Sequence, residues 1–222
     1  MKVVILILGA CGVGKTSLAR ALAGDLVEHV ACNLYYDERS HCYRSEKIVY
    51  ALSCSGRIAL AGSVQSGSDS ISRSETLRRL INLLFDSSDV IVVDAFRTSM
   101  SFVDWLQHHP KRGLGTIIVH IDIPEKINVD RLEGRRARRG QREANLPSRT
   151  YANLLSLRRR AERVWEYARA SYKRTPNEFV IIGEGLTPEQ AADRVWKAVA
   201  KISQTVSRKG KRHDGRSARK IC

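Results

Sequence analysis

Short runs of aliphatic residues alternate along this chain with longer stretches in which apolar residues recur every three or four positions. A continuous β-branched and aliphatic run is typical of a strand that is buried on both faces, whereas the wider spacing is typical of an amphipathic helix. The runs predict strands at residues 2–8, 30–36, 89–94, 116–123 and 179–182. The spacing predicts helices at residues 15–27, 74–86, 99–109, 149–172 and 188–202, with one more beginning after Pro124.

Strands that alternate with helices indicate an α/β protein with a mostly parallel sheet. We therefore expect three layers, with helices on both faces of a five-stranded sheet. Residues 47–52 and 57–61 depart from the alternation, because they flank the turn sequence SCSG and so predict an antiparallel β-hairpin. A loop rich in Gly and Ser follows at residues 62–70. We expect this region, about residues 45–73, to be an insertion on the substrate side.

Length and charge add a domain boundary to this picture. With 222 residues and 43% hydrophobic content, the chain is long enough for one sizeable domain and too apolar to be wholly disordered. The net charge of +15 is uneven, because residues 131–163 hold eleven Arg and three Glu, and residues 203–222 hold seven basic residues and one acid. We expect a domain over residues 1–202 and a disordered basic tail over 203–222. Such basic segments attract DNA or RNA, since contacts with phosphates release counterions.

Cysteine usage and hydropathy bear on the compartment. Five scattered cysteines without a C-x-x-C pair predict free thiols in a reducing compartment. No apolar run reaches about 18 residues, so the sequence predicts no transmembrane helix and no membrane partner. The apolar residues 3–8 have the length of a short signal-peptide core, but the motif that follows explains them better as a strand. We expect a cytoplasmic protein.

The segment GACGVGKT at residues 9–16 matches the pattern G-x-x-x-x-G-K-[ST] in full, between a predicted buried strand and a predicted helix. Glycines let such a loop curl so that backbone N–H groups point at a phosphate, and the helix N-terminus adds partial positive charge. Lys15 would reach the β- and γ-phosphates of ATP, and the Thr16 hydroxyl would help to hold Mg²⁺. The residues expected to bind ATP in this loop are Gly9, Cys11, Gly12, Val13, Gly14, Lys15, Thr16 and Ser17.

This loop and its context resemble the P-loop nucleoside triphosphatase superfamily, which implies a three-layer P-loop fold. The chain lacks the N-K-x-D stretch by which GTPases read guanine. A second stretch, in which a strand leads through Pro124 and Glu125 into a helix with the run RLEGRR at 131–136, resembles the start of the lid of adenylate kinase and its nucleoside monophosphate kinase relatives. The resemblance covers about residues 1–27, 89–94 and 116–202.

The resemblance implies an arginine-rich lid over about residues 131–160. Guanidinium groups there would neutralise the charge that spreads over the transferred phosphoryl group while the lid excludes water. By position, Arg131 would stack on the ATP base and Arg135 would reach the phosphates and act in catalysis. Arg139 shares their helical face by its spacing, and Arg149 and Arg160 would supply later lid arginines. The alternative is a solvated basic face or a nucleic-acid patch.

Acidic residues stand at two predicted strand ends. Asp94 ends a run of four apolar residues, where its carboxylate would lie beside the loop and orient Mg²⁺. Asp37 follows the second predicted strand, and the resemblance implies a catalytic base at this place in kinases that phosphorylate a hydroxyl. Asp69, in the Gly- and Ser-rich loop, is the rival for that catalytic role, and Arg73 is a candidate for binding a substrate phosphate.

Together these features predict an ATP- and Mg²⁺-dependent kinase for a nucleotide, a nucleoside or a similar small acceptor. One alternative is a kinase that acts on a hydroxymethylated base or an end of DNA or RNA, because the hairpin and the G-x-D-x-I-S sequence after it resemble phage-type kinases of modified pyrimidines in DNA. A second alternative is a nucleic-acid-binding ATPase module. Intact Lys15, Thr16 and Asp94 speak against a module with a vestigial ATP site.

Overall fold

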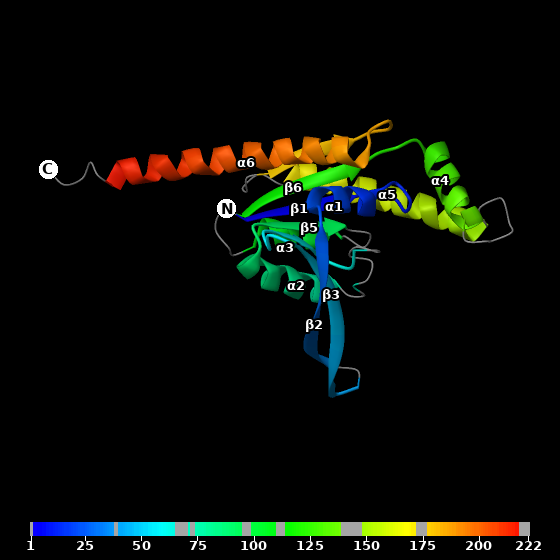
Figure 1. Ribbon diagram of the computed structural model, residues 1–222, viewed down its shortest axis with the longest axis horizontal. Coiled ribbons are helices and arrows are strands. Elements are labelled where there is room, and N and C mark those ends of the chain that lie inside the picture. Colours follow the sequence, from blue (N-terminus) through cyan, green and yellow to red (C-terminus); the bar gives the residue numbers. More distant parts are fainter. Residues whose placement is uncertain are drawn as a thin grey trace.

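The computed structural model describes residues 2–37, 40–64, 71, 74–94, 99–109, 114–138, 148–171 and 177–217 of the chain. Within them, one mixed sheet contains the strands β1 (Lys2–Leu8), β2 (Leu26–Asp37), β3 (Cys42–Ser53), β4 (Ile58–Leu60), β5 (Val90–Asp94), β6 (Leu114–Ile121) and β7 (Asn177–Ile182) (Figure 1). The helices are α1 (Lys15–Ala23), α2 (Ser74–Ser87), α3 (Met100–Gln107), α4 (Glu125–Arg138), α5 (Ser148–Ser171) and α6 (Pro188–Ser217).

β1 lies inside the sheet, whose strand order is β2-β3-β4-β5-β1-β6-β7. Its side chains alternate between two hydrophobic cores, because successive residues of a strand point to opposite faces. Ile5 belongs to the core that includes residues of α1 and α6, whereas Leu6 belongs to the core built with α2, α3 and α5. Figure 1 shows α6 along one side of the sheet and α2 and α3 along the other. The molecule therefore has the three α/β layers that the sequence predicts.

The five strands β4, β5, β1, β6 and β7 run parallel to one another. The prediction that residues 30–36 supply one of the parallel strands is wrong. These residues lie in β2, which pairs antiparallel with β3 from Leu26 opposite Ser53 to Asp37 opposite Cys42. The four residues between β2 and β3 allow the chain to reverse, but a parallel pair needs a crossover of a dozen or more residues. The short β4 lies beside β5 instead.

The predicted hairpin around residue 55 is present, because Ala51 of β3 pairs antiparallel with Leu60 of β4. Both strands belong to the main sheet. The longer hairpin is the one formed by β2 and β3, which we call the β-arm (Leu26–Asp37 and Cys42–Ser53). Figure 1 shows the β-arm projecting from the layered body.

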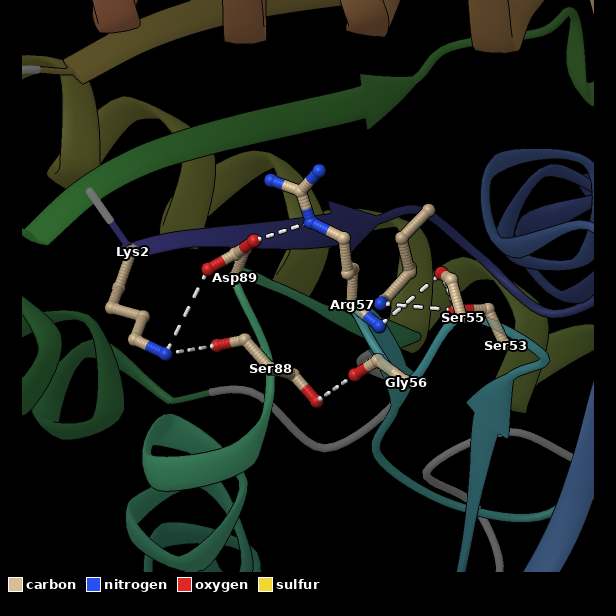
Figure 2. A network of polar contacts seen from close by, with 8 residues as sticks. Lys2, Ser53, Ser55, Gly56, Arg57, Ser88 and Asp89 are labelled. Atoms are coloured by element: carbon tan, nitrogen blue, oxygen red, sulfur yellow. Dashed lines mark hydrogen bonds and ion pairs between the residues drawn. The ribbon is translucent and has the colours of Figure 1, made fainter.

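Polar contacts join the elements at the end of the sheet where β1 and β5 begin (Figure 2). Arg57 Nε donates a hydrogen bond of 2.7 Å to Asp89 Oδ2, and Lys2 Nζ donates one of 2.9 Å to the Ser88 carbonyl oxygen. The Ser88 hydroxyl donates to the Gly56 carbonyl oxygen at 3.1 Å. The hydrogen bond from Arg57 lowers the pKa of the Asp89 carboxyl group. This network lies at the opposite end of β1 from the glycine-rich loop.

Helix α6 continues to Ser217, beyond Ile202 where the sequence analysis ends it. The prediction of a disordered tail is therefore wrong for residues 203–217, which are helical. Residues 218–222 lie outside the described part of the chain. The segment contains no proline, and adding residues to an existing helix avoids the unfavourable nucleation step.

The four cysteines within the described residues are free thiols, as predicted. In the same part of the chain, no helix is both long and apolar enough to span a bilayer.

Ile202 is the last buried residue among those of α6 whose burial the structure describes, which end at Thr205. We expect stability to depend on Ile202 and not on the residues beyond. Its Cγ2 atom lies 2.7 Å from where a Cβ on Gly115 would stand, which shows how closely α6 packs on β6. Ile202→Ala should lower the free energy of unfolding in urea by about 2–4 kcal/mol. A chain that ends at Ser203 should keep the parent value within about 0.5 kcal/mol. A large loss of unfolding free energy in the shortened chain would show that the residues of α6 beyond Ser203 also stabilise the fold.

Candidate nucleotide-binding site

The glycine-rich loop connects the carboxyl end of β1 to the first residue of α1, beside the ends of β5 and β6. Ligands of open α/β sheets bind at such a place, outside the carboxyl ends of the strands. Gly14 precedes the helix with a φ of 107°, and its carbonyl oxygen accepts the first helical hydrogen bond, from Leu18 N at 3.0 Å. A side chain at that φ would be strained, so glycine is needed where the loop turns into α1.

Lys15 is held across the loop. Its side chain is only 7% exposed, and Nζ donates a hydrogen bond of 2.9 Å to the carbonyl oxygen of Ala10. A lysine is rarely buried to this extent unless its ammonium group has partners. The charge is therefore kept at the loop itself, where it would meet the phosphates of a nucleotide.

Thr16 and Asp94 meet at the carboxyl ends of β1 and β5. The Thr16 hydroxyl donates a 2.5 Å hydrogen bond to Asp94 Oδ2, and Asp94 is 1% exposed. The register of the sheet causes this meeting, because Ile7 of β1 lies opposite Asp94 in β5. Mg²⁺ prefers hydroxyl, carboxylate and water oxygens, usually with one or two carboxylates and substrate phosphates. The two residues predicted to hold the metal thus fit it by their chemistry and are adjacent.

A cavity of about 390 Å³ opens beside the loop. One wall is α4 with Arg131, Arg135 and Arg138, and the opposite wall is the connection from β7 to α6, residues 183–188. Arg131 Nη1 also donates a hydrogen bond of 3.1 Å to the Val13 carbonyl oxygen of the loop. The volume suits a small molecule, since ligand pockets begin at about 300 Å³. The structure therefore brings both predicted lid arginines of α4, Arg131 and Arg135, to the phosphate-binding loop.

Asp37 lies elsewhere. It is the last residue of β2, at the far end of the β-arm, where Arg44 Nε lies 2.9 Å from its Oδ2 and the Ser40 hydroxyl donates to the same oxygen at 2.9 Å. The structure does not bring Asp37 to the phosphate-binding loop, and the ion pair and hydrogen bond give its carboxylate a local role in the arm. The rival base Asp69, together with Arg73 and Arg139, lies outside the described residues. Arg149 and Arg160 both lie in α5.

Asn128 of α4 is a residue that the sequence analysis missed. It is fully buried, and its Oδ1 lies 3.0 Å from where a Cβ on Gly12 would stand. Within the described residues, neither side-chain polar atom of Asn128 has a hydrogen-bond partner. Leu132, one turn along α4, has its Cδ2 atom 2.8 Å from the same Cβ position. An available signal was the spacing of four between Asn128 and Leu132, which places a polar residue on the helix face that packs on the loop.

Arg158 is the second residue that was missed. Its guanidinium group donates to the Ile123 carbonyl oxygen at 2.8 Å and to Asp122 Oδ1 at 3.1 Å. These bonds attach α5 to the connection between β6 and α4, so Arg158 supports the base of the arginine-bearing helix. Three consecutive arginines occupy residues 158–160, and their pattern alone does not distinguish the structural one.

A family model described as an AAA domain matches residues 5–152, from β1 into the first turns of α5. This family is of the P-loop nucleoside triphosphatase type and includes kinase-like members. The matched region contains the loop, Asp94, all of α4 and both predicted ATP-binding arginines. No curated protein sequence matches the chain.

Two glycines beside this cavity should respond oppositely to alanine. Gly12 has a φ of 83° and packs against Leu132 and Asn128, so Gly12→Ala should destabilise the protein by about 1–3 kcal/mol and weaken ATP binding. Gly134 lies within α4, where a Cβ would meet only Arg138 Nη1 at 3.9 Å. Gly134→Ala should therefore stabilise the helix by about 0.5–1 kcal/mol. Urea unfolding and ATP titration measure both effects, and a stable Gly12→Ala protein with parent affinity would contradict the packing described.

Proposed function

Because the chain belongs to the AAA domain family of P-loop proteins, we propose that it is an ATP-dependent kinase that transfers the γ-phosphoryl group to a nucleotide, a nucleoside or a similar small acceptor. The observation that carries the proposal is the cavity between the phosphate-binding loop and α4, with Arg131 and Arg135 in its wall. In phosphoryl transfer such groups neutralise charge on the transferred phosphoryl oxygens.

In this proposal ATP lies with its base in the cavity and its phosphates along the loop. Arg131 contacts the base side, and backbone N–H groups of residues 9–16 bind the phosphates together with Lys15. Thr16 and Asp94 would hold Mg²⁺, which would supply positive charge beside the phosphates. Arg135 donates hydrogen bonds to the phosphates and to the group in transfer. The arginines of α4 and α5 form a lid that excludes water, so the acceptor and not water receives the phosphoryl group.

The second candidate is a kinase whose acceptor is part of DNA or RNA. The observation that favours it is the length of α6, which Figure 1 shows running past the sheet. Five basic residues lie in this part of the helix: Arg208, Lys209, Lys211, Arg212 and Arg216. A basic helix that extends from the body suits contact with a polyanion.

The test is a screen for ATP consumption with Mg²⁺ across mononucleotides, nucleosides and 5′-hydroxyl or modified oligonucleotides. We expect one acceptor class to stimulate ATP turnover well above the rate without acceptor, and Lys15→Ala to abolish it, because the loop loses its phosphate-binding charge. Lys126→Ala is the matched control, since Lys126 is an exposed lysine of α4 outside the cavity. Full activity in a folded Lys15→Ala protein would overturn the proposal. Stimulation by oligonucleotides alone would favour the second candidate.

A pair of acid-to-amide variants distinguishes acceptor chemistries. If the acceptor is a hydroxyl and Asp69 is the base that takes its proton, Asp69→Asn should lower kcat by roughly 10²–10⁴ while ATP affinity persists. Asp37→Asn is the control, because Asp37 lies at the end of the β-arm and should leave kcat unchanged. If the acceptor is already a phosphate, no base is needed and Asp69→Asn should leave kcat near its parent value. A loss of kcat in Asp37→Asn alone would return the role of base to Asp37.

A further inference from the structure

The β-arm carries an unusual share of the exposed apolar surface. Nine large hydrophobic side chains are strongly exposed in the described part of the chain, and five of them belong to the arm: Val27, Val30, Leu34, Tyr36 and Tyr43. Tyr43 is 79% exposed and Leu34 is 68% exposed. Scattered exposed hydrophobic residues are normal, but a contiguous group marks an interaction site.

The arm has one covered face and one open face. Residues directly opposite in an antiparallel pair share a face, so Val30, Leu34, Tyr36 and Tyr43 all lie on the same side. Tyr36 and Tyr43 are in ring contact, with centroids 5.4 Å apart. On the other side, the Thr76 hydroxyl of α2 donates to Glu46 of β3 at 2.7 Å, and Ile48 is buried. The apolar group is therefore on the face that α2 does not cover.

β2 is also an edge strand. It is the first strand in the sheet order, and within the described residues no strand pairs with its outer side. Proteins usually protect long edges with lysine, proline or bulges, because open N–H and C=O groups attract another strand. The twelve residues of β2 contain no lysine, arginine or proline. The edge thus lacks these common forms of protection.

We propose that the outer edge of β2 pairs antiparallel with the same edge in a second copy of this chain, joining the two sheets across a two-fold axis. A two-fold axis perpendicular to the sheet keeps the open face of both arms on one side. The apolar residues of the two copies then form one continuous strip. This interface is independent of the proposed kinase activity.

The register follows from the side chains. With Cys32 on the axis, Val30 lies opposite Leu34 of the second copy, and Glu28 lies opposite Tyr36. In this register no like charges lie directly opposite each other. Opposed like charges would destabilise the pairing. Centring the axis on Ala31 instead would place Glu28 opposite Leu34. The register on Cys32 pairs eleven of the twelve residues of β2 with each other.

Edge pairing brings the apolar side chains of the two copies together along the seam. In the register on Cys32, Val30 and Leu34 of one copy contact Leu34 and Val30 of the other as cross-strand pairs, while Tyr36 and Tyr43 remain on the open face. The described residues of the arm carry three acids, Glu28, Asp37 and Glu46, against the bases Arg44 and Lys47. A near-neutral apolar arm suits a protein surface better than a nucleic acid, which recruits basic patches.

The first test measures the mass of the full chain by light scattering over a range of concentrations. We expect a species of twice the 24.9 kDa chain mass. Leu34→Lys and Val30→Lys should each raise the dimer dissociation constant by roughly tenfold or more, because a lysine on an edge opposes pairing. Leu83→Lys is the matched control, since Leu83 is another exposed leucine, on α2, and it should leave the dimer unchanged. A parent chain that is monomeric throughout, or that assembles only when oligonucleotide is added, would overturn the proposal.

The second test probes the register with diamide, which takes up two electrons and two protons as two thiols form one disulfide. Opposed residues of antiparallel strands have Cα atoms about 4.5–5.5 Å apart, which is within the range for a disulfide. The parent chain and Cys42→Ser should form a covalent dimer, and Cys32→Ser should not. A dimer in solution that crosslinks equally well without Cys32 would overturn edge pairing about this residue.

Discussion

The burial of β1 on both faces is the constraint on which the site depends. Its residues from Val3 to Leu8 are almost entirely inaccessible, so the strand cannot shift along its neighbours without exposing one core or the other. The end of β1 is therefore held at one level relative to β5 and β6. At that level Asp94 meets Thr16, and the loop begins its turn. A hydrophobic requirement thus sets the position of polar groups that act on a ligand.

Helix α4 adds a second, more local constraint. It contacts Gly12 through Asn128 and Leu132, bonds to Val13 through Arg131, and also forms a wall of the cavity. Within the described residues the deeply buried amide of Asn128 has no hydrogen-bond partner, and an unsatisfied amide of this kind costs about 1–3 kcal/mol. The cost falls beside the phosphate-binding loop, where proteins commonly retain locally unfavourable groups. Packing of the loop and shape of the cavity are accordingly set by the same helix.

The sequence predicted what depends on local pattern. The loop, the strand before it, the helix after it and the acid at the end of β5 follow from hydrophobic runs and a motif whose spacing is dictated by phosphate binding. The sequence did not predict the pairing of residues 30–36, because an apolar run looks the same in a parallel strand and in an antiparallel arm. Asp37 was misplaced for that reason. Asn128 and Arg158 act through contacts with residues more than thirty positions away, and a local pattern, such as the spacing of Asn128 and Leu132, can mark a helix face but not its distant partner.

Helix α4 both packs on the loop and forms a wall of the cavity, and this has an evolutionary consequence. Substitutions in this helix that alter nucleotide affinity also alter the stability of the loop, so selection on one property constrains the other. The β-arm and the outer part of α6 carry no such coupling, because they lie away from the loop and the cavity. Among descendants of one ancestor, α4 should change slowly, while the arm and the end of α6 diversify. New partners can be acquired at the periphery of this fold while its phosphate-binding loop is inherited intact.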